Sequence, residues 1–289
     1  MNILTFDIEE WYFESRKLAR QEKYAEYDRY LDSILDKLDE RGFKATFFCV
    51  GEMGRLFPDV VRKIDSRGHE VGCHSNIHTW LNKMTPEECR EDTRAAVDSL
   101  QQCIGEKILS YRAPAFSIGE SNKWAFEILA ENGIERDSSV FPAARDFGGF
   151  ANFGCQKPCI ISYNGIQIKE FPIPMVNFVG KQVAYSGGGY FRFFPLWFIK
   201  NQMAKSDYAM TYFHMDDLST DKHIMLDRQK YEKYYRETGT IINRYIRFVK
   251  ANVGKGKAFD KLFSLLDYFN FINIEMVDMS YQWNNTIVL

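Results

Sequence analysis

The segment Ile3-Leu4-Thr5-Phe6-Asp7 near the start of the chain is a short apolar run that ends in an acidic residue. Apolar residues then recur at helical spacing from Tyr24 to Leu38, and Gly42 ends this predicted helix. Residues 3–42 therefore predict one buried strand followed by one helix. This unit decides the fold, because the same pattern recurs along the chain.

Strand and helix patterns alternate after this first unit, and proline or glycine marks many of their boundaries. Pro58 begins a helix that Gly68 ends, and Thr85-Pro86-Glu87-Glu88 is a capping box for a helix that ends at Gly105. The runs with strand character are 3–7, 44–50, 69–73, 107–111, 134–137, 166–171, 208–213 and 271–277. Repeated βα units predict an α/β fold with a parallel sheet, and seven or eight units favour a closed or nearly closed barrel.

The pattern is weaker in the second half of the chain. Gly, Pro and Asn are scattered over 138–165, which predicts a long loop region, and Ser186-Gly187-Gly188-Gly189-Tyr190 predicts a turn before a helix at 195–204. Helical patterns occupy about 227–268. Neither an internal repeat nor a linker divides the sequence, so residues 1–289 are predicted to form a single domain.

Composition excludes several classes of protein. The 37 basic and 39 acidic side chains nearly balance, which argues against nucleic acid or an anionic membrane as the main partner. Cys155 and Cys159 lack the second pair of ligands that a zinc site needs. The sequence from Met1 to Asp7 has no signal-peptide pattern, and no apolar run reaches the roughly 18 residues of a membrane span. A reduced, cytoplasmic protein without a membrane span is expected.

Five reactive side chains lie at or just past the carboxyl ends of predicted strands: Asp7, His74, Arg112, Asp137 and His214. In a parallel barrel these ends share one rim, where active sites are built from the βα loops. Five such residues reaching one rim independently is improbable by chance. The sequence therefore predicts an active site at this rim.

A pair of histidines follows the third predicted strand, in His74-Ser75-Asn76-Ile77-His78. In a helix, or in a loop entering one, this spacing puts both rings on one side and suits a transition metal, although such pairs are also common as solvated or capping residues. Asp7 and Glu9 are two apart on a strand and share a face, so one carboxylate could complete the metal site and the other act as a base. The alternative is a polar strand end that faces water.

The other rim residues each allow two interpretations. Arg112, in Tyr111-Arg112-Ala113-Pro114-Ala115-Phe116, could orient a catalytic carboxylate or form a structural ion pair. Asp137 could tune a histidine or cap a turn. His214 follows an apolar strand, where a lone histidine is more often structural.

Taken in order, these residues resemble the polysaccharide deacetylase family, the family 4 carbohydrate esterases. The matching segments are 5–11, 45–48, 68–71, 74–78, 111–118, 137–139 and 213–214. The acid followed by Trp11, and the Gly-Gly-Gly-Tyr-Phe-Arg stretch at 187–192, resemble a branch associated with bacterial exopolysaccharide clusters. The resemblance implies a single-domain distorted (β/α) barrel with about seven parallel strands.

The resemblance also implies catalytic roles. Asp7 corresponds to the general base and Arg112 to its partner, while His214 corresponds to the general acid and Asp137 to the residue that tunes it. After His214 the chain reads Met215-Asp216-Asp217-Leu218, whereas the branch usually has Pro-Trp-Glu.

The implied metal ligands are His74 and His78, with a third ligand that differs from the family pattern. Many members have two adjacent aspartates in the first motif, but Ile8 follows the aspartate here, so Glu9 is expected to bind the metal and Glu10 is the alternative. Zinc is the first choice of ion, and cobalt, nickel or iron also suits these ligands. The expected substrate contacts are Trp11, Ala115, Phe116 and Tyr190.

The function implied is the removal of N-acetyl groups from amino sugars of a poly- or oligosaccharide. A metal-dependent hydrolase of a small cyclic amide or ureide, such as allantoin, is the alternative activity. A sugar-binding protein without catalysis is a third reading, which the presence of a candidate base, acid and ligand pair disfavours.

Overall fold

The computed structural model describes residues 1–9, 20–145, 148–220, 222–235 and 237–289. A nine-stranded sheet runs through the molecule in the order β10-β1-β2-β3-β4-β5-β7-β6-β11. In chain order these strands are β1 (Asn2–Ile8), β2 (Thr46–Cys49), β3 (Glu70–Cys73), β4 (Ser110–Tyr111), β5 (Arg136–Asp137), β6 (Cys159–Tyr163), β7 (Ile166–Glu170), β10 (Ala209–His214) and β11 (Thr286–Val288).

Seven of the strands, from β10 to β7 in the sheet order, pair in parallel. This confirms the fold predicted from the repeated βα units and the expected number of parallel strands. Within the described part of this sheet only β6 and β7 pair antiparallel, through the turn at 164–165. Within the described residues β10 and β11 are the two edges of the sheet, so the barrel is not closed by hydrogen bonds between them.

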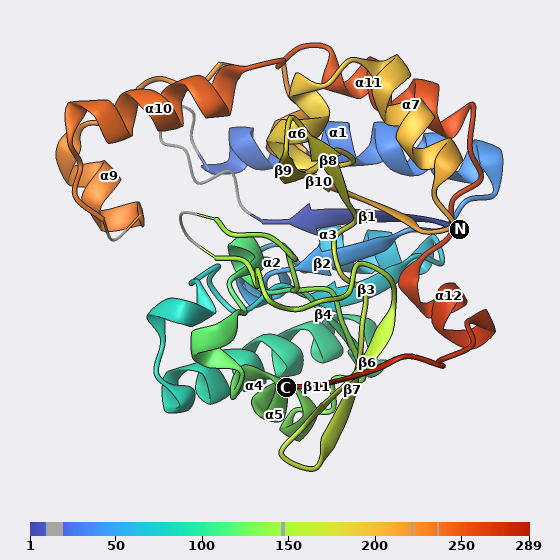
Figure 1. Ribbon diagram of the computed structural model, residues 1–289. Coiled ribbons are helices and arrows are strands. Elements are labelled where there is room, and N and C mark those ends of the chain that lie inside the picture. Colours follow the sequence, from blue (N-terminus) through green and yellow to red (C-terminus); the bar gives the residue numbers. More distant parts are fainter. Residues whose placement is uncertain (10–19, 146–147, 221, 236) are drawn as a thin grey trace.

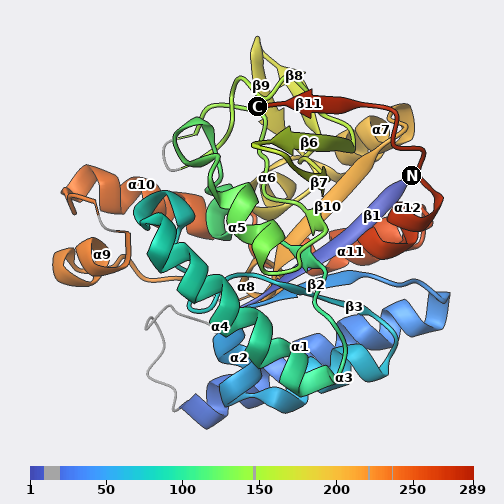
Figure 2. The same ribbon diagram turned by 90° about the horizontal axis from the view of Figure 1, so that it is seen from below.

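Helices surround the strands (Figures 1 and 2). The first half contributes α1 (Arg20–Arg41), α2 (Gly51–Leu56), α3 (Pro58–Ser66), α4 (Pro86–Ile104) and α5 (Ala125–Glu131). Thr85 and Glu88 form the predicted capping box of α4, which ends at Gly105 with a φ of 78°. In α3, Val60, Val61 and Ile64 are buried. No helix in the described part of the chain has the length and apolar character needed to cross a membrane.

The second half of the chain differs from the prediction in three places. The predicted loop region 138–165 contains β6, and the glycine run predicted as a turn begins a helix, α6 (Gly188–Phe193). The predicted strand at 271–277 is wrong. Only Ile272 bridges to β1, and Asn273 caps α12 (Ile274–Ser280) by accepting a hydrogen bond from the backbone of Met276.

The remaining elements of this half are the hairpin β8 (Met175–Phe178) and β9 (Lys181–Ala184) and five helices. These helices are α7 (Leu196–Lys205), α8 (Met215–Leu218), α9 (Arg228–Tyr235), α10 (Ile241–Asn252) and α11 (Ala258–Leu266). In Figures 1 and 2, α9 and α10 project from the end of the molecule toward which β1 points.

Side chains along β1 point alternately to the two faces of the sheet, and the polar ones point into the barrel. Leu4, Phe6 and Ile8 belong to the larger apolar cluster, and the ring of Phe6 stacks on that of Phe47 at 4.9 Å. The residues between them, Thr5 and Asp7, therefore face the opposite side of the strand. In the sheet register Asp7 lies between Phe48 and His214, which brings the carboxyl ends of β1 and β10 together.

Candidate metal and catalytic site

Three side chains at the carboxyl ends of β1 and β3 converge on one point. One ligand atom from each of Glu9, His74 and His78 lies within 4.8 Å of the others. The Oε2 atom of Glu9 is 2.6 Å from Nε2 of His78, and the two imidazole rings are 5.1 Å apart. Two imidazoles and one carboxylate are a ligand set that binds divalent transition metals.

The orientation of His74 suits metal binding. Its Nδ1 atom is 2.7 Å from the carbonyl oxygen of Arg112, which can only accept, so Nδ1 carries the proton and Nε2 keeps its lone pair. Among the described residues no hydrogen-bond partner meets this buried Nε2 atom. Burial lowers the pKa of His74 to about 4, so the ring is neutral at physiological pH. A buried lone pair of this kind fits a metal ion.

The loop after β3 sets the spacing of the two histidines. Ser75 and His78 have positive φ angles of 63° and 60°, so this segment is a loop and not a helix. The Ser75 hydroxyl accepts a hydrogen bond from the backbone N–H of His78, and Asp92 on α4 accepts one from Asn76. These contacts hold both rings on the same side, which is the outcome predicted from their spacing.

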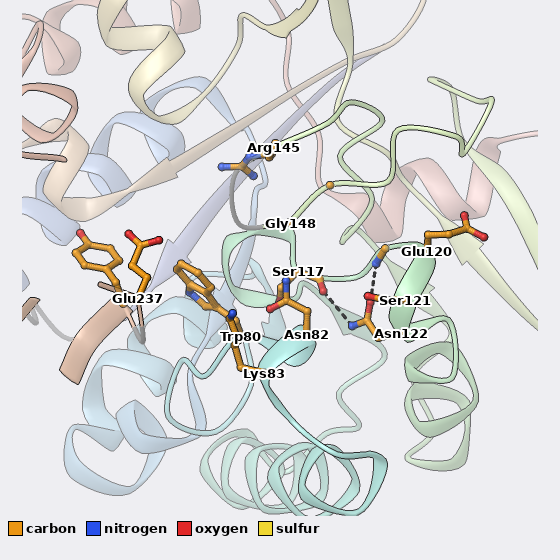
Figure 3. Close-up of a pocket in the computed structure, with 13 residues that line it drawn as sticks. Trp80, Asn82, Lys83, Ser117, Glu120, Ser121, Asn122, Arg145, Gly148 and Glu237 are labelled. Carbon is orange, nitrogen blue, oxygen red and sulfur yellow. Dashed lines mark hydrogen bonds between the residues drawn. The ribbon is translucent and has the colours of Figure 1, made fainter. Parts of the chain in front are cut away.

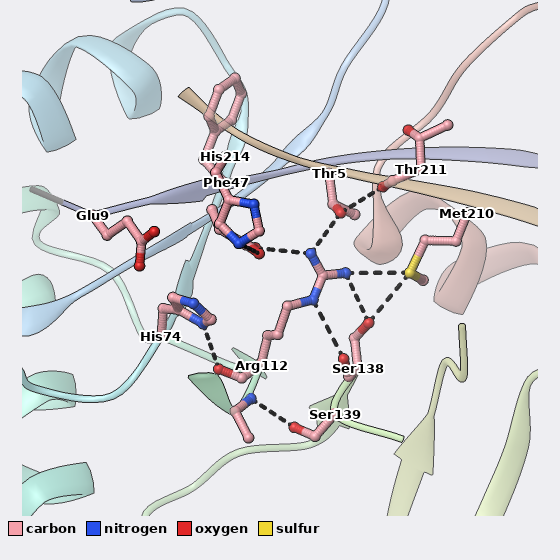
Figure 4. A network of polar contacts seen from close by, with 12 residues as sticks. Thr5, Glu9, Phe47, His74, Arg112, Ser138, Ser139, Met210, Thr211 and His214 are labelled. Carbon is pink, nitrogen blue, oxygen red and sulfur yellow. Dashed lines mark hydrogen bonds and ion pairs between the residues drawn. The ribbon is translucent and has the colours of Figure 1, made fainter. Parts of the chain in front are cut away.

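Asp7 is a buried carboxylate that contacts Arg112 and His214, and Figure 4 shows the side chains of these two residues near Glu9 and His74. It is 2% exposed, and Nη1 of Arg112 donates to its Oδ1 atom at 2.8 Å. Burial alone would raise the pKa of Asp7, but the guanidinium lowers it below its usual value, so the carboxylate is ionised. Its Oδ2 atom is 3.6 Å from Nε2 of His214.

Arg112 is fully buried and held on several sides. It donates to the hydroxyls of Thr5 and Ser138, at 2.7 and 2.9 Å, and lies 4.3 Å from the centre of the Phe48 ring. A guanidinium bound in this way has a fixed direction. Arg112 therefore holds Asp7 in a fixed direction through a buried ion pair. This ion pair is the structural role expected for Arg112, and the catalytic role stays a prediction.

The carboxylate that hydrogen-bonds to His214 is that of Asp217. Nδ1 of His214 is 2.7 Å from Oδ2 of Asp217, whose other oxygen is 2.9 Å from Nε of Arg192. Burial would lower the pKa of His214, but Asp217 raises it to about 10. The imidazole is therefore protonated at neutral pH, and its Nε2–H points toward Asp7.

Asp137, expected from the sequence to tune His214, contacts other groups. The Ser139 hydroxyl donates to Asp137 at 2.5 Å, and Glu170 on β7 is its neighbour in the register. Burial, and then the nearby Asp137, raise the pKa of Glu170 well above its usual value. Asp137 thus holds Ser139, which accepts from the backbone of Ala113, and the assignment of the tuning residue is corrected to Asp217.

Sequence reasoning missed Asp217 and Arg192, although each had a signal. Asp217 follows His214 by three residues at the start of the short helix α8, where the backbone N–H of His214 also donates to its carboxylate. In a capping box, an acidic residue at the third position of a helix accepts a hydrogen bond from the backbone N–H of the N-cap residue, which here is His214. Arg192 ends the glycine-rich stretch at 187–192, which entered the sequence analysis only through its resemblance to a branch of the family.

The four residues expected to contact the substrate differ in burial and packing, and one of them is not described by the structure. Trp11 and the alternative ligand Glu10 lie outside the described residues. Phe116 is 4% exposed and packs edge-on against Tyr212, so its ring belongs to the core wall. Ala115 is partly exposed with a φ of 54°, and Tyr190 is half-buried with its ring stacked near Phe141.

A pocket of about 380 Å³ opens beside this site (Figure 3). One wall is formed by Trp80, which follows the ligand His78 by two residues, and another by Ser117 and its neighbours after the Arg112 turn. Tyr235, which ends α9, and Glu237 also line the pocket, and the rings of Trp80 and Tyr235 are 6.5 Å apart. The lining combines aromatic faces with hydroxyl, amide and charged groups.

Comparisons with known proteins divide the chain into two matched parts. Residues 3–136 match the family described as polysaccharide deacetylase, and residues 138–278 match a domain of unknown function, DUF3473. The site crosses this division, because the ligands lie in the first part and His214 and Asp217 in the second.

Curated relatives match over short segments. A peptidoglycan-N-acetylglucosamine deacetylase of Bacillus cereus is 37% identical over 95 residues, covering 32% of this chain and 34% of that protein. A chitooligosaccharide deacetylase of Bradyrhizobium is 25% identical, covering 34% of this chain and 42% of that protein. The matches thus span less than half the length of these two relatives.

Solved structures share the fold over most of the chain. A Mycobacterium smegmatis protein assigned to the polysaccharide deacetylases superposes with a TM-score of 0.58 at 18% identity, covering 96% of this chain and 88% of that one. A 4-alpha-glucanotransferase of Thermococcus litoralis gives 0.57 at 13% identity, over 100% of this chain and 41% of that one. The first part of the chain, residues 3–136, thus matches the polysaccharide deacetylase family.

Proposed function

We propose that this chain is a metal-dependent hydrolase that removes N-acetyl groups from the amino sugars of a poly- or oligosaccharide. One observation carries the proposal. The three candidate ligands Glu9, His74 and His78 converge within 4.8 Å, next to an ionised Asp7 and a protonated His214. A ligand set, a base and an acid in one place are what the hydrolysis of an unactivated amide needs.

Glu9, His74 and His78 would hold the ion, and zinc is the first choice among the transition metals that suit them. When bound, such an ion supplies Lewis acidity toward water and toward an acetyl carbonyl oxygen. The Arg112 carbonyl binds Nδ1 of His74, which leaves the Nε2 lone pair as the one that would hold the ion. The backbone N–H of Ala115 is the proposed second group that stabilises the negative oxygen formed on the acetyl carbon.

The proton steps use Asp7 and His214. Arg112 occupies Oδ1 of Asp7, so Oδ2 takes a proton from water as the water oxygen bonds to the acetyl carbon. Nε2 of His214 then gives its proton to the amide nitrogen, and the C–N bond breaks to release acetate and the sugar amine. Asp217 stabilises the imidazolium until this transfer.

A saccharide is favoured over a cyclic amide as the substrate. Two curated relatives are named for N-acetylglucosamine in peptidoglycan and for chitooligosaccharides. The pocket beside the site carries Trp80 together with hydroxyl and amide groups, a lining that suits the faces and edges of sugar rings.

Acetate release from N-acetylated oligosaccharides, with allantoin as the competing substrate, tests the proposal. We expect release that stops when the protein is stripped of metal and returns with a divalent transition metal. His74→Ala should lower bound metal by at least roughly tenfold, measured by elemental analysis. Full activity of the metal-stripped protein would show that the proposal is wrong.

The third ligand can be tested separately by metal titration. Glu9→Gln should weaken binding sharply, because its carboxylate lies against His78. Glu10→Gln is the matched control and should leave the affinity nearly unchanged. The reverse order would move the third ligand to Glu10.

A further inference from the structure

The helix α10 presents an apolar stripe that the described part of the chain leaves exposed. No residue of this helix is buried, and Ile242 and Tyr245 are 67% and 59% exposed. The exposed apolar side chains are Ile241, Ile242, Tyr245, Ile246, Val249 and Val253. The last five follow the i, i+3, i+4, i+7 spacing of one helix face. An exposed apolar face of this length marks an interaction surface.

The segment around this stripe is strongly basic, although the whole chain is not. Residues 222–257 hold ten Lys or Arg against three Asp or Glu, a net charge of +7 in a chain whose formal charge is −2. The overall balance therefore hides a local excess of positive charge. Six of these basic residues are exposed, namely Lys222, Arg228, Lys230, Lys233, Lys250 and Lys257.

We propose that the exposed face of α10, with the basic residues around it, docks onto the surface of an anionic lipid bilayer. A helix with an apolar face and a cationic surround lies in the plane of the membrane interface, with its apolar side among the acyl chains and its cations at the headgroups. A second copy of this chain fits less well, because the pairing of two such faces would bring two segments of charge +7 together.

Docking would place the catalytic site close to the membrane surface. Arg247 on α10 forms an ion pair with Glu237 at 3.3 Å and lies over the ring of Tyr235. Both of these partners line the pocket beside the metal ligands. Figure 1 likewise shows α9 and α10 at the end of the molecule toward which β1 points. A saccharide held at the bilayer would thus be within reach of the site.

Co-sedimentation with lipid vesicles tests the proposal on the full chain. We expect the protein to pellet with vesicles of phosphatidylcholine and phosphatidylglycerol, and far less with vesicles of phosphatidylcholine alone. Raising the salt concentration should reduce the binding, because the attraction between surface charges is screened. The variant Ile242→Asp/Val249→Asp should partition at least about tenfold more weakly into the anionic vesicles.

Met279→Asp is the matched control, since Met279 is an apolar residue of α12 that is 79% exposed. It should bind as the wild type does, and circular dichroism should show that all variants are folded. Three results would overturn the proposal: no binding to anionic vesicles, equal loss in the control, or a dimer that Ile242→Asp separates without any vesicle binding. Pelleting measures no acetate, so these outcomes are independent of the proposed activity.

Discussion

At the scale of single residues, the contact between His214 and Asp217 determines the protonation of the proposed acid. The carboxylate lies 2.7 Å from Nδ1 and raises the pKa of the imidazole to about 10, against the effect of burial. Because the proposed mechanism uses the protonated form of His214, activity should be lost as the pH rises through this pKa.

Asp217→Asn should therefore move the basic limb of the pH profile of kcat/KM to lower pH, by roughly one to three units. Asp217→Glu should restore part of the shift. Asp216→Asn is the control, because the carboxylate of Asp216 forms ion pairs with His223 and Lys255. A basic limb at the wild-type pH in Asp217→Asn would mean that another residue is the acid.

The buried pair of Arg112 and Asp7 couples stability to the site. Arg112→Met would leave the Asp7 charge buried without its partner, which should lower the free energy of unfolding by roughly 3–5 kcal/mol. The double variant Asp7→Asn/Arg112→Met should cost less than the sum of the two single changes. Urea denaturation of all four proteins measures this coupling, and strictly additive values would contradict it.

At the scale of elements, the glycine run before α6 shows how closely this segment packs on β10. A Cβ atom added at Gly187 would lie 2.3 Å from both the ring and the carbonyl oxygen of Tyr212. At Gly189 the nearest atom would be a terminal nitrogen of Arg192, at an ordinary 3.6 Å. A Cβ atom added at Gly188 would also be close to the Tyr212 ring, at 2.9 Å, and Gly188 has a φ of 52°. Packing against Tyr212 therefore requires glycine at 187 and 188 but not at 189.

Gly187→Ala should destabilise the protein by roughly 1–3 kcal/mol, because backbone and ring must both shift. Gly189→Ala, in the same helix-forming run, should be neutral or stabilising by up to about 1 kcal/mol, as alanine is the better helix former. Thermal and urea unfolding of the two variants compare them directly. Equal destabilisation would show that the run is sensitive for a reason other than contact with Tyr212.

At the scale of the whole molecule, we propose that residues 1–289 fold as one domain although two family models divide it. Strand β1 pairs with β2 on one side and with β10, from the second part, on the other. The second part also supplies His214 and Asp217 to the site.

A fragment of residues 1–137 should therefore show no cooperative unfolding transition, because β1 would become an exposed apolar edge. The full chain should unfold in one transition, followed by circular dichroism and by tryptophan fluorescence. Two separate transitions, or a fragment that folds alone, would show that the halves are independent.

The sequence by itself predicted the parallel barrel and the place of the site. Alternating strand and helix patterns imply parallel strands, and their carboxyl ends must share one rim, so Asp7, His74, Arg112 and His214 were predicted to meet. The spacing of Asp7 and Glu9 along one strand likewise predicted that both would face the same side. These conclusions follow from backbone geometry, which local sequence largely determines.

Only the tertiary structure decided which side chains touch. Asp137 ends a strand as Asp7 does, yet it turns toward Ser139 and Glu170, and Asp217 reaches His214 from the helix that follows. The run at 271–277 suits a strand or a helix, and contacts with β1 and the cap at Asn273 select the helix. The direction of a side chain at a strand end, and the choice between strand and helix for a short apolar run, depend on residues that are distant in the sequence. Tertiary packing decides which residues these are.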